Sequence, residues 1–280
     1  MKSLYLSAFI FFISVQLTFG QWENINVNFN DNFTGVVFLD NNGLVSGHSG
    51  LYYTTNYGNT AADWTRFEIT TNPGDSDIYE NTVFSHCYAN DEDATNSGFV
   101  YASGVNSLTN NAVIFRLNFP SLDYEIIYNG AANTSINKIG FNDSTDSYYA
   151  VGDNGLIIGF SDASPTSYLI NPSSTDFNNE DFNSVSFNSN RLWLGADGKV
   201  FYGNHYGTDN YINLSSYDTP GVNHVGLDFR STYNMYSAGN NYSRFSISTG
   251  TTYNNRFDFG DLNAQTMINS SNQHLIGTDH

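Results

Sequence analysis

The chain has 280 residues, of which 13% are charged and 16% are aromatic, and its formal net charge is −18. This negative charge disfavours binding to nucleic acid and to anionic lipid, because phosphate groups are repelled by an acidic surface. The 20 Tyr, 22 Phe and 24 Gly favour strands joined by tight turns and exclude a helical bundle.

Residues 1–20 have the organisation of a secretory signal. Lys2 stands before the apolar run LYLSAFIFFIS, and Gly20 supplies a small residue ahead of Gln21. The run is shorter than the ~20 apolar residues that a membrane-spanning helix needs. We therefore expect cleavage near Gly20/Gln21 and a mature chain, residues 21–280, that is secreted or held at the cell surface without a membrane span.

A short pattern recurs along the rest of the chain with a period of roughly 46 residues. It consists of an apolar run, Gly, two polar residues and often a second Gly, and then another apolar run. Its copies lie around Gly47, Gly104, Gly152, Gly195, Gly239 and Gly277. Upstream of several copies, at Asn137, Asn183 and Asn223, an Asn precedes apolar residues at alternating positions. This alternation indicates a strand with one buried face.

Each repeat predicts four antiparallel strands with a short turn between the second and the third. Asn154-Gly155 and Asp197-Gly198 suit that turn, because a two-residue hairpin needs positive φ at both positions. Such units predict an all-β fold, a β-propeller of about five full blades and a partial one. The expected blades cover residues 29–72, 80–130, 134–173, 179–218 and 222–260, with a partial blade at 261–280. A β-sandwich and a parallel β-helix are the alternatives, but neither has this period.

The two ends of the chain resemble parts of blades. QWENINVN at residues 21–28 resembles DWTRFEIT, the expected fourth strand of the first repeat, as in propellers that complete one blade with both termini. Residues 261–280 supply a first and a second strand and stop where a third should begin. Because this stop leaves an unpaired sheet edge, we expect the chain to be a fragment of a six- to eight-bladed ring.

The first repeat continues into TTNYGNTAADW, which resembles a degenerate Asp-box, Ser/Thr-x-Asp-x-Gly-x-Thr-Trp. Thr54, Gly58 and Thr60 match, Asn56 replaces the Asp, and Trp64 comes three residues late. The chain is thus similar to exported propellers of the Asp-box (BNR) type and to photosystem II stability/assembly factor-like propellers of Bacteroidota. The resemblance implies that Thr54, Asn56 and Gly58 shape the turn between the third and fourth strands, and that this turn is structural.

The motifs do not single out a catalytic site. Sialidases share the Asp-box fold, but their arginine motif is not found near the start of the first repeat. A glycan-active hydrolase or lyase stays the alternative function, since the 27 acidic residues provide many carboxylate pairs. Cys87, the one cysteine, excludes an internal disulfide and is expected to pack as a small apolar residue.

The densest acidic cluster is NDEDATNSG, residues 90–98. Asp91 and Asp93 alternate as in a calcium loop, but the central Gly and the final Glu of an EF-hand are missing. A solvated loop is the preferred interpretation, with weak Ca²⁺ binding as the alternative. The six His have no metal-ligand spacing, so no cofactor and no further metal site is expected.

Polar residues recur in the turn between the second and third strands, at His48, Asp153, Asp197 and Asn240. In a propeller these turns lie on one face around the axis, where equal placement would form a polar rim and a binding surface. The competing interpretation is that Asp and Asn simply favour turns. The leading hypothesis is a non-catalytic exported scaffold that binds a cationic or hydroxyl-rich protein or glycan partner at the cell surface.

Overall fold

The computed structural model describes most of the chain from residue 29 onward. The described residues are 29–89, 98–163, 166–172, 177, 179–189, 191–205, 211–224, 226–231, 234–238, 243–246, 251–253, 264–270 and 273–278. The expected signal at residues 1–20 and the expected strand at residues 21–28 therefore lie outside the described residues.

Three successive sheets of four antiparallel strands occupy the first part of the fold. Blade 1 contains β1 (Phe33–Leu39), β2 (Asn42–Gly47), β3 (Gly50–Thr54) and β4 (Thr65–Arg66). Blade 2 contains β5 (Thr82–Ala89), β6 (Gly98–Asn106), β7 (Asn111–Phe119) and β8 (Asp123–Ala132). Blade 3 contains β9 (Ile136–Asn142), β10 (Ser147–Gly152), β11 (Ile157–Phe160) and β12 (Tyr168–Leu169).

The later sheets follow the same up-and-down order. Blade 4 contains β14 (Ser184–Asn188), β15 (Arg191–Asn204) and β17 (Ser215–Asn223), and the long β15 pairs with β14 through its first part and with β17 through its second. Blade 5 contains β18 (Gly226–Ser231), β19 (Asn234–Ala238), β20 (Ser243–Ser246) and β21 (Thr251–Tyr253). β22 (Ala264–Ser270) pairs with β23 (Gln273–Thr278), and β13 (Asn171–Pro172) pairs in parallel with β16 (Tyr211–Ile212).

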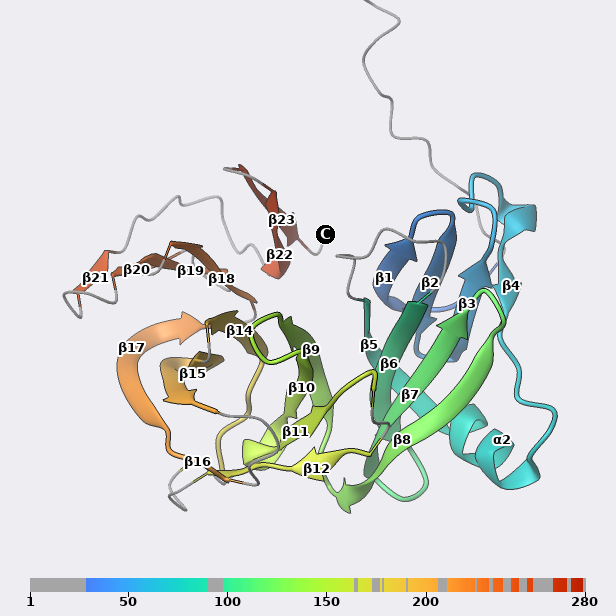
Figure 1. The fold of residues 1–280 in the computed structure, drawn as a ribbon, viewed down its shortest axis with the longest axis horizontal. Helices are drawn as coiled ribbons and strands as arrows, with labels where there is room; N and C mark the ends of the chain where they lie inside the picture. Colours follow the sequence, from blue (N-terminus) through green and yellow to red (C-terminus); the bar gives the residue numbers. More distant parts are fainter. Residues whose placement is uncertain are drawn as a thin grey trace, which may run out of the picture.

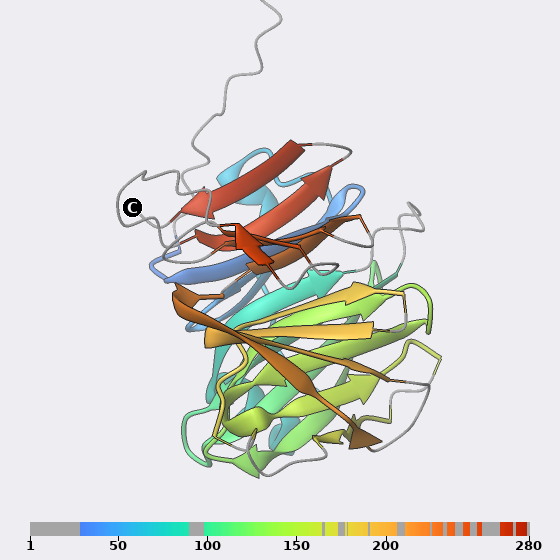
Figure 2. The same ribbon diagram turned by 90° about the vertical axis from the view of Figure 1, so that its left-hand side faces the viewer.

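The sheets follow one another around a common centre (Figure 1). The first strand of each sheet contacts the first strand of the next, in the series β1, β5, β9, β14, β18 and β22. Seen from the side of blade 4, the strands within a sheet are strongly twisted (Figure 2). The prediction of an all-β propeller built from four-stranded antiparallel blades is confirmed.

Both faces of the middle blades are buried. On β10, Tyr148 and Ala150 belong to the core between blades 2 and 3, whereas Tyr149 and Val151 belong to the core between blades 3 and 4. Because successive side chains of a strand point to opposite faces, one strand supplies two cores. A sheet covered on both sides reads as a continuous apolar run, which explains why β10 is buried at every position.

One α-helix interrupts the strands of the described residues, and it was not predicted from the sequence; two short 3-10 helices, η1 (Ala61–Asp63) and η2 (Asp153–Gly155), lie in turns. α2 (Pro73–Glu80) begins after Asn72, whose side chain accepts a hydrogen bond from the Gly74 N–H, and Pro73 occupies its first turn. Asn followed by Pro is a helix-start signal, because the side chain caps a free N–H and Pro presets the backbone. No helix in the described part of the chain is both long enough and apolar enough to cross a bilayer.

Candidate functional site

The residues of the predicted polar rim differ in their surroundings. His48 is exposed in the turn between β2 and β3, and Asp197 is exposed on β15. Asp153 is half-buried after β10, and Asn240 lies outside the described residues. Asn154 (φ 56°) and Gly155 (φ 73°) have the positive φ values predicted for this turn, whereas at Asp197-Gly198 Gly198 alone has one, at 68°. A shared binding role for the rim residues stays a prediction.

Asp153 is committed to hydrogen bonds within its own blade. Its Oδ2 accepts from the Ser135 hydroxyl at 2.7 Å and its Oδ1 accepts from Asn137 Nδ2 at 2.9 Å. Asn137 Nδ2 also donates to the main-chain oxygen of Phe182, which precedes β14 of the next blade. Asp153 thus holds Ser135 and positions Asn137, the residue that links blade 3 to blade 4. Its role is structural.

Similar polar links join other first strands. The Ser85 hydroxyl of β5 donates to the carbonyl of Ile136 in β9. Asn183 Nδ2 donates to Asn223 Oδ1 at 3.1 Å, and the Ser184 hydroxyl donates to the His224 carbonyl at 2.7 Å. Side chains of the first strands thus link one blade to the next, as Ser85 of β5 and Asn137 of β9 do.

The Asp-box-like turn after β3 is held by its own side chains. The Asn56 N–H donates to Thr54 Oγ1 at 3.2 Å, and Trp64 Nε1 donates to the Gly58 carbonyl at 3.0 Å. Gly58 has φ 63°, and a Cβ there would lie 2.5 Å from the Trp64 ring, so both backbone and space require glycine. These contacts support the structural interpretation of Thr54, Asn56 and Gly58.

The other candidate residues, for calcium binding or cysteine chemistry, do not form a site in the described part of the chain. Asp91 and Asp93, the calcium candidates, lie outside the described residues. Cys87 is buried, and burial raises the pKa of its thiol to about 11. Among the described residues, no group of three or more His, Cys, Asp or Glu side chains could hold a metal ion.

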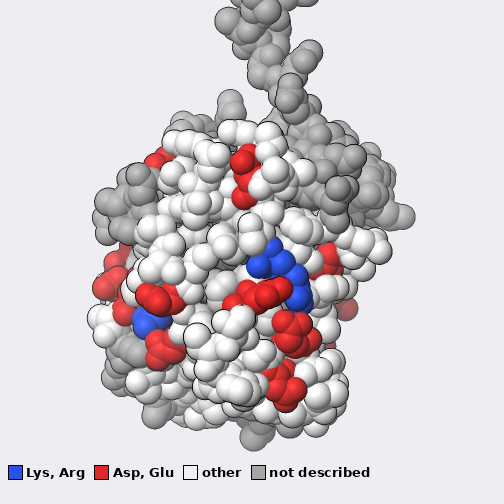
Figure 3. Space-filling view, turned by 90° about the vertical axis from the view of Figure 1, so that its right-hand side faces the viewer, with Lys and Arg blue, Asp and Glu red and all other residues white. Residues whose placement is uncertain are grey.

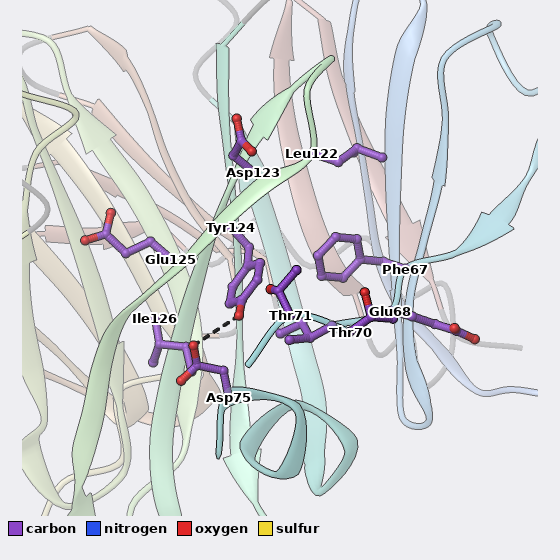
Figure 4. Close-up of a pocket in the computed structure, with 11 residues that line it drawn as sticks. Phe67, Glu68, Thr70, Thr71, Asp75, Leu122, Asp123, Tyr124, Glu125 and Ile126 are labelled. Atoms are coloured by element: carbon purple, nitrogen blue, oxygen red, sulfur yellow. Dashed lines mark hydrogen bonds between the residues drawn. The ribbon is translucent and has the colours of Figure 1, made fainter. Parts of the chain in front are cut away.

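A groove that the sequence motifs did not reveal lies between blades 1 and 2. One wall is the segment Phe67–Thr71, which follows β4, and the other is Leu122–Ile126, which opens β8, while Asp75 of α2 adds to the lining. Its volume is about 630 Å³, and a second hollow of about 500 Å³ continues it past Thr65 and Arg66. The two hollows share Phe67, Glu68 and Leu122 and therefore adjoin each other. Figure 4 shows the larger one.

Main-chain atoms contribute to both walls of the groove. Phe67 and Ile69 are buried while Glu68 and Thr70 are exposed, as expected of a chain whose successive side chains point to opposite faces. Five consecutive residues of each wall nevertheless line the groove. Because alternating side chains cannot all face one space, main-chain atoms contribute to the lining of each wall. β8 is the last strand of its sheet, so its outer edge has no strand neighbour among the described residues.

Buried hydrogen bonds fix the Phe67 wall. The Tyr79 hydroxyl of α2 donates to the Phe67 carbonyl at 2.8 Å and accepts from the Leu51 N–H at 3.0 Å. Across the groove the Tyr124 hydroxyl donates to Asp75 Oδ2 at 3.0 Å, and the Tyr124 ring meets the Phe67 ring edge to face at 6.2 Å. Figure 4 shows Tyr124 between the two walls, directed toward Asp75.

The groove is acidic. Four acidic residues, Glu68, Asp75, Asp123 and Glu125, are among those that line it. Glu125 pairs with Arg116 at 2.6 Å, whereas Glu68, Asp75 and Asp123 form no ion pair within the described residues. Figure 3, which shows the side that carries β4, α2 and β8, has more red than blue, and its blue atoms lie against red ones. Arg66, in the second hollow, is itself paired with Glu80 at 2.9 Å.

Comparisons with known proteins place the fold. No protein-family model matches the chain, and no curated protein matches it in sequence. Among solved structures the chain is similar to "YCF48 bound to D1 peptide", with a TM-score of 0.61 and 15% identity over 91% of this chain and 78% of that one.

A second similar structure is the extracellular domain of a putative one component system from B. thetaiotaomicron. The TM-score is 0.62 and the identity 12%, and the match covers 92% of this chain but 33% of that one. At such identities both likenesses show a shared propeller fold.

Proposed function

We propose that this protein is an exported, non-catalytic propeller that binds a protein partner through the groove between blades 1 and 2. The observation that carries the proposal is the outer edge of β8 in one groove wall, Leu122–Ile126, which has no strand neighbour among the described residues. Unpaired N–H and C=O groups along a strand edge are suited to an extended polypeptide, since a peptide can add to the edge as a further strand.

The shape of the groove favours a binding role. It is open and lies between two sheets, and its Phe67 wall is held by the buried Tyr79 contacts. A preformed surface binds with little ordering of its own residues, which favours affinity. One of the structurally similar propellers, YCF48, is bound to a D1 peptide, which agrees with a peptide-binding use of this fold.

Export and the type of propeller belong to the same proposal. The signal-like residues 1–20, with cleavage near Gly20/Gln21, direct the chain out of the cytoplasm, to secretion or to the cell surface. The turn of Thr54, Asn56 and Gly58 supports a place among Asp-box type propellers. The similar extracellular domain agrees with an exported location.

A peptide-display selection tests the proposed function. Random twelve-residue peptides are selected on the purified chain, and each enriched peptide is then measured on two variants. Thr70→Trp places a bulky ring on the exposed wall of the groove, whereas Thr55→Trp makes the same change at an exposed position after β3. We expect binding to fall about tenfold or more on Thr70→Trp and to stay unchanged on Thr55→Trp.

Two outcomes would contradict the proposal. One is that no peptide is enriched, and the other is that enriched peptides bind both variants equally well. A parallel glycan array separates the remaining alternative, because a glycan that binds the wild-type groove and is lost on Thr70→Trp would show a carbohydrate partner instead of a protein.

A further inference from the structure

We propose that the partner segment is extended and carries lysine or arginine, and that it pairs with the free edge of β8 as an added strand. This inference rests on the proposed function and deepens it by naming the chemistry of the partner. It follows from three features of the groove: its unpaired edge, the ends of that edge, and the carboxylates that flank it.

The unpaired edge is short and has clear ends. At one end Leu122 adopts φ 61° in the turn from β7, which departs from strand geometry. At the other end the Ser167 hydroxyl of blade 3 donates to the Ile127 carbonyl at 2.6 Å. The free edge is therefore Asp123–Ile126, and a bound strand would pair with about four residues there, at ~3.4 Å per residue.

Of the described residues, the charged side chains beside this edge that form no ion pair are all acidic. Asp123 stands at the start of the free edge and Glu68 on the opposite wall, and both side chains are exposed. Neither pairs with a basic group within the described residues. Asp75 accepts hydrogen bonds from Tyr124 and from Asn72 Nδ2, so its charge is held in place below the edge.

The basic groups near the groove are already engaged. Arg66 donates to the Ser49 carbonyl and to Glu80, and Arg116 pairs with Glu125. The field that a partner meets is therefore negative, in a chain whose formal charge is −18. A lysine- or arginine-bearing strand would gain both main-chain pairing and charge complementarity, and an acidic strand would be repelled.

Three synthetic peptides test the inference. Each has ten residues, blocked ends and a Thr/Val alternation, and they differ only at three positions, which are Lys, Ser or Glu. Affinity is measured by fluorescence anisotropy at low and high salt, and amide hydrogen exchange is followed at Asp123–Ile126. We expect the Lys peptide to bind about tenfold tighter than the Ser peptide at low salt, the Glu peptide to bind weakest, and the differences to shrink at high salt.

Two further comparisons sharpen the test. The double variant Glu68→Lys and Asp123→Lys should lose the preference for the Lys peptide. The control Asp143→Lys and Asp218→Lys, which changes the charge equally at exposed sites elsewhere, should keep it. If the Lys variant is poorly folded by circular dichroism, Glu68→Gln with Asp123→Asn replaces it. N-methylation of alternate peptide amides should abolish binding in one register and spare it in the other, as strand pairing requires.

The outcomes distinguish this inference from the proposed function. If all three peptides bind equally and protect Asp123–Ile126, the charge preference is wrong and the protein-binding groove stands. If N-methylation has no effect in either register, the added strand is wrong. If peptides selected at random bind the groove but the Lys peptide does not, the inference fails alone; if none of them bind there, the proposed function fails as well.

Discussion

The turns between second and third strands and the groove between blades 1 and 2 show two ways in which polar groups are used. In the turns, the half-buried Asp153 satisfies Ser135 and Asn137, and the first strands of successive blades are tied together. In the groove, the outer edge of β8 and the exposed Glu68 and Asp123 face outward, without strand or ion-pair partners in the described part of the chain.

The difference teaches how repetition should be interpreted in a repeat fold. A polar residue that recurs in each repeat meets a need that each repeat has, such as closing a turn or joining the next blade. The groove lies at the junction where α2 enters between β4 and β5, and α2 is the one α-helix of the described residues. A search for repeated polar residues therefore finds the scaffold more readily than the binding surface.

The largest expected effect concerns the hydroxyl that holds the groove wall. Tyr79→Phe removes the partner of both the Phe67 carbonyl and the Leu51 N–H in a buried site, so the free energy of unfolding should fall by about 3 kcal/mol. Tyr128→Phe is the matched control, because no hydrogen bond of its hydroxyl is found in the described chain, and it should change stability by less than about 0.5 kcal/mol. Urea unfolding of both variants measures this. Equal losses would mean that Tyr79 does not hold the wall in the way described.

The next effect concerns pH and the blade-joining region. Burial lowers the pKa of His224 to about 4, against about 6.5 when unfolded. The unfolded chain therefore binds a proton between these values that the folded chain does not, and stability falls as the pH drops through this window. His224 should therefore make the protein about 2 kcal/mol less stable at pH 5 than at pH 7. Burial also lowers the pKa of His86, mainly by desolvation, so His86 adds to the loss in the same direction.

Urea unfolding at pH 7 and pH 5 measures this loss. The control is His224→Phe, which should show a smaller difference between the two pH values by about that amount. An identical pH dependence in wild type and variant would show that His224 is not kept neutral in the fold.

The smallest effects separate two aspartates that occupy similar turns. Asp153→Ala leaves Ser135 and Asn137 without their acceptor and should destabilise the protein by about 1–2 kcal/mol. Asp197→Ala, at an exposed position, should change stability by less than about 0.5 kcal/mol. Thermal unfolding of the two variants side by side measures the difference. If Asp197→Ala is as destabilising as Asp153→Ala, both turns have the same role and the contrast between them is wrong.

The α2 helix carries a start signal in the sequence that was not sufficient to predict it. Asn72-Pro73 is a start signal, and the cap from Asn72 to Gly74 follows from it. The segment is short, and it carries few apolar residues besides Ile78 and Tyr79, so periodicity does not mark it. What stabilises it is the packing of Tyr79 against Phe67 and Phe84 on the flanking segments and against Phe115 of β7.

By itself, the sequence determined the class of fold. Alternating apolar residues, Asn- and Gly-containing turns and a repeat of roughly 46 residues predict stacked four-stranded sheets, because strands and turns are specified by local sequence. Tertiary structure decided the rest. It alone brings Phe67–Thr71 beside Leu122–Ile126, leaves the β8 edge unpaired, and satisfies Asp153 while Asp197 stays exposed. The physical reason is that a site built from main-chain edges depends on which segments the blades bring together, and main-chain groups are the same for almost every residue type.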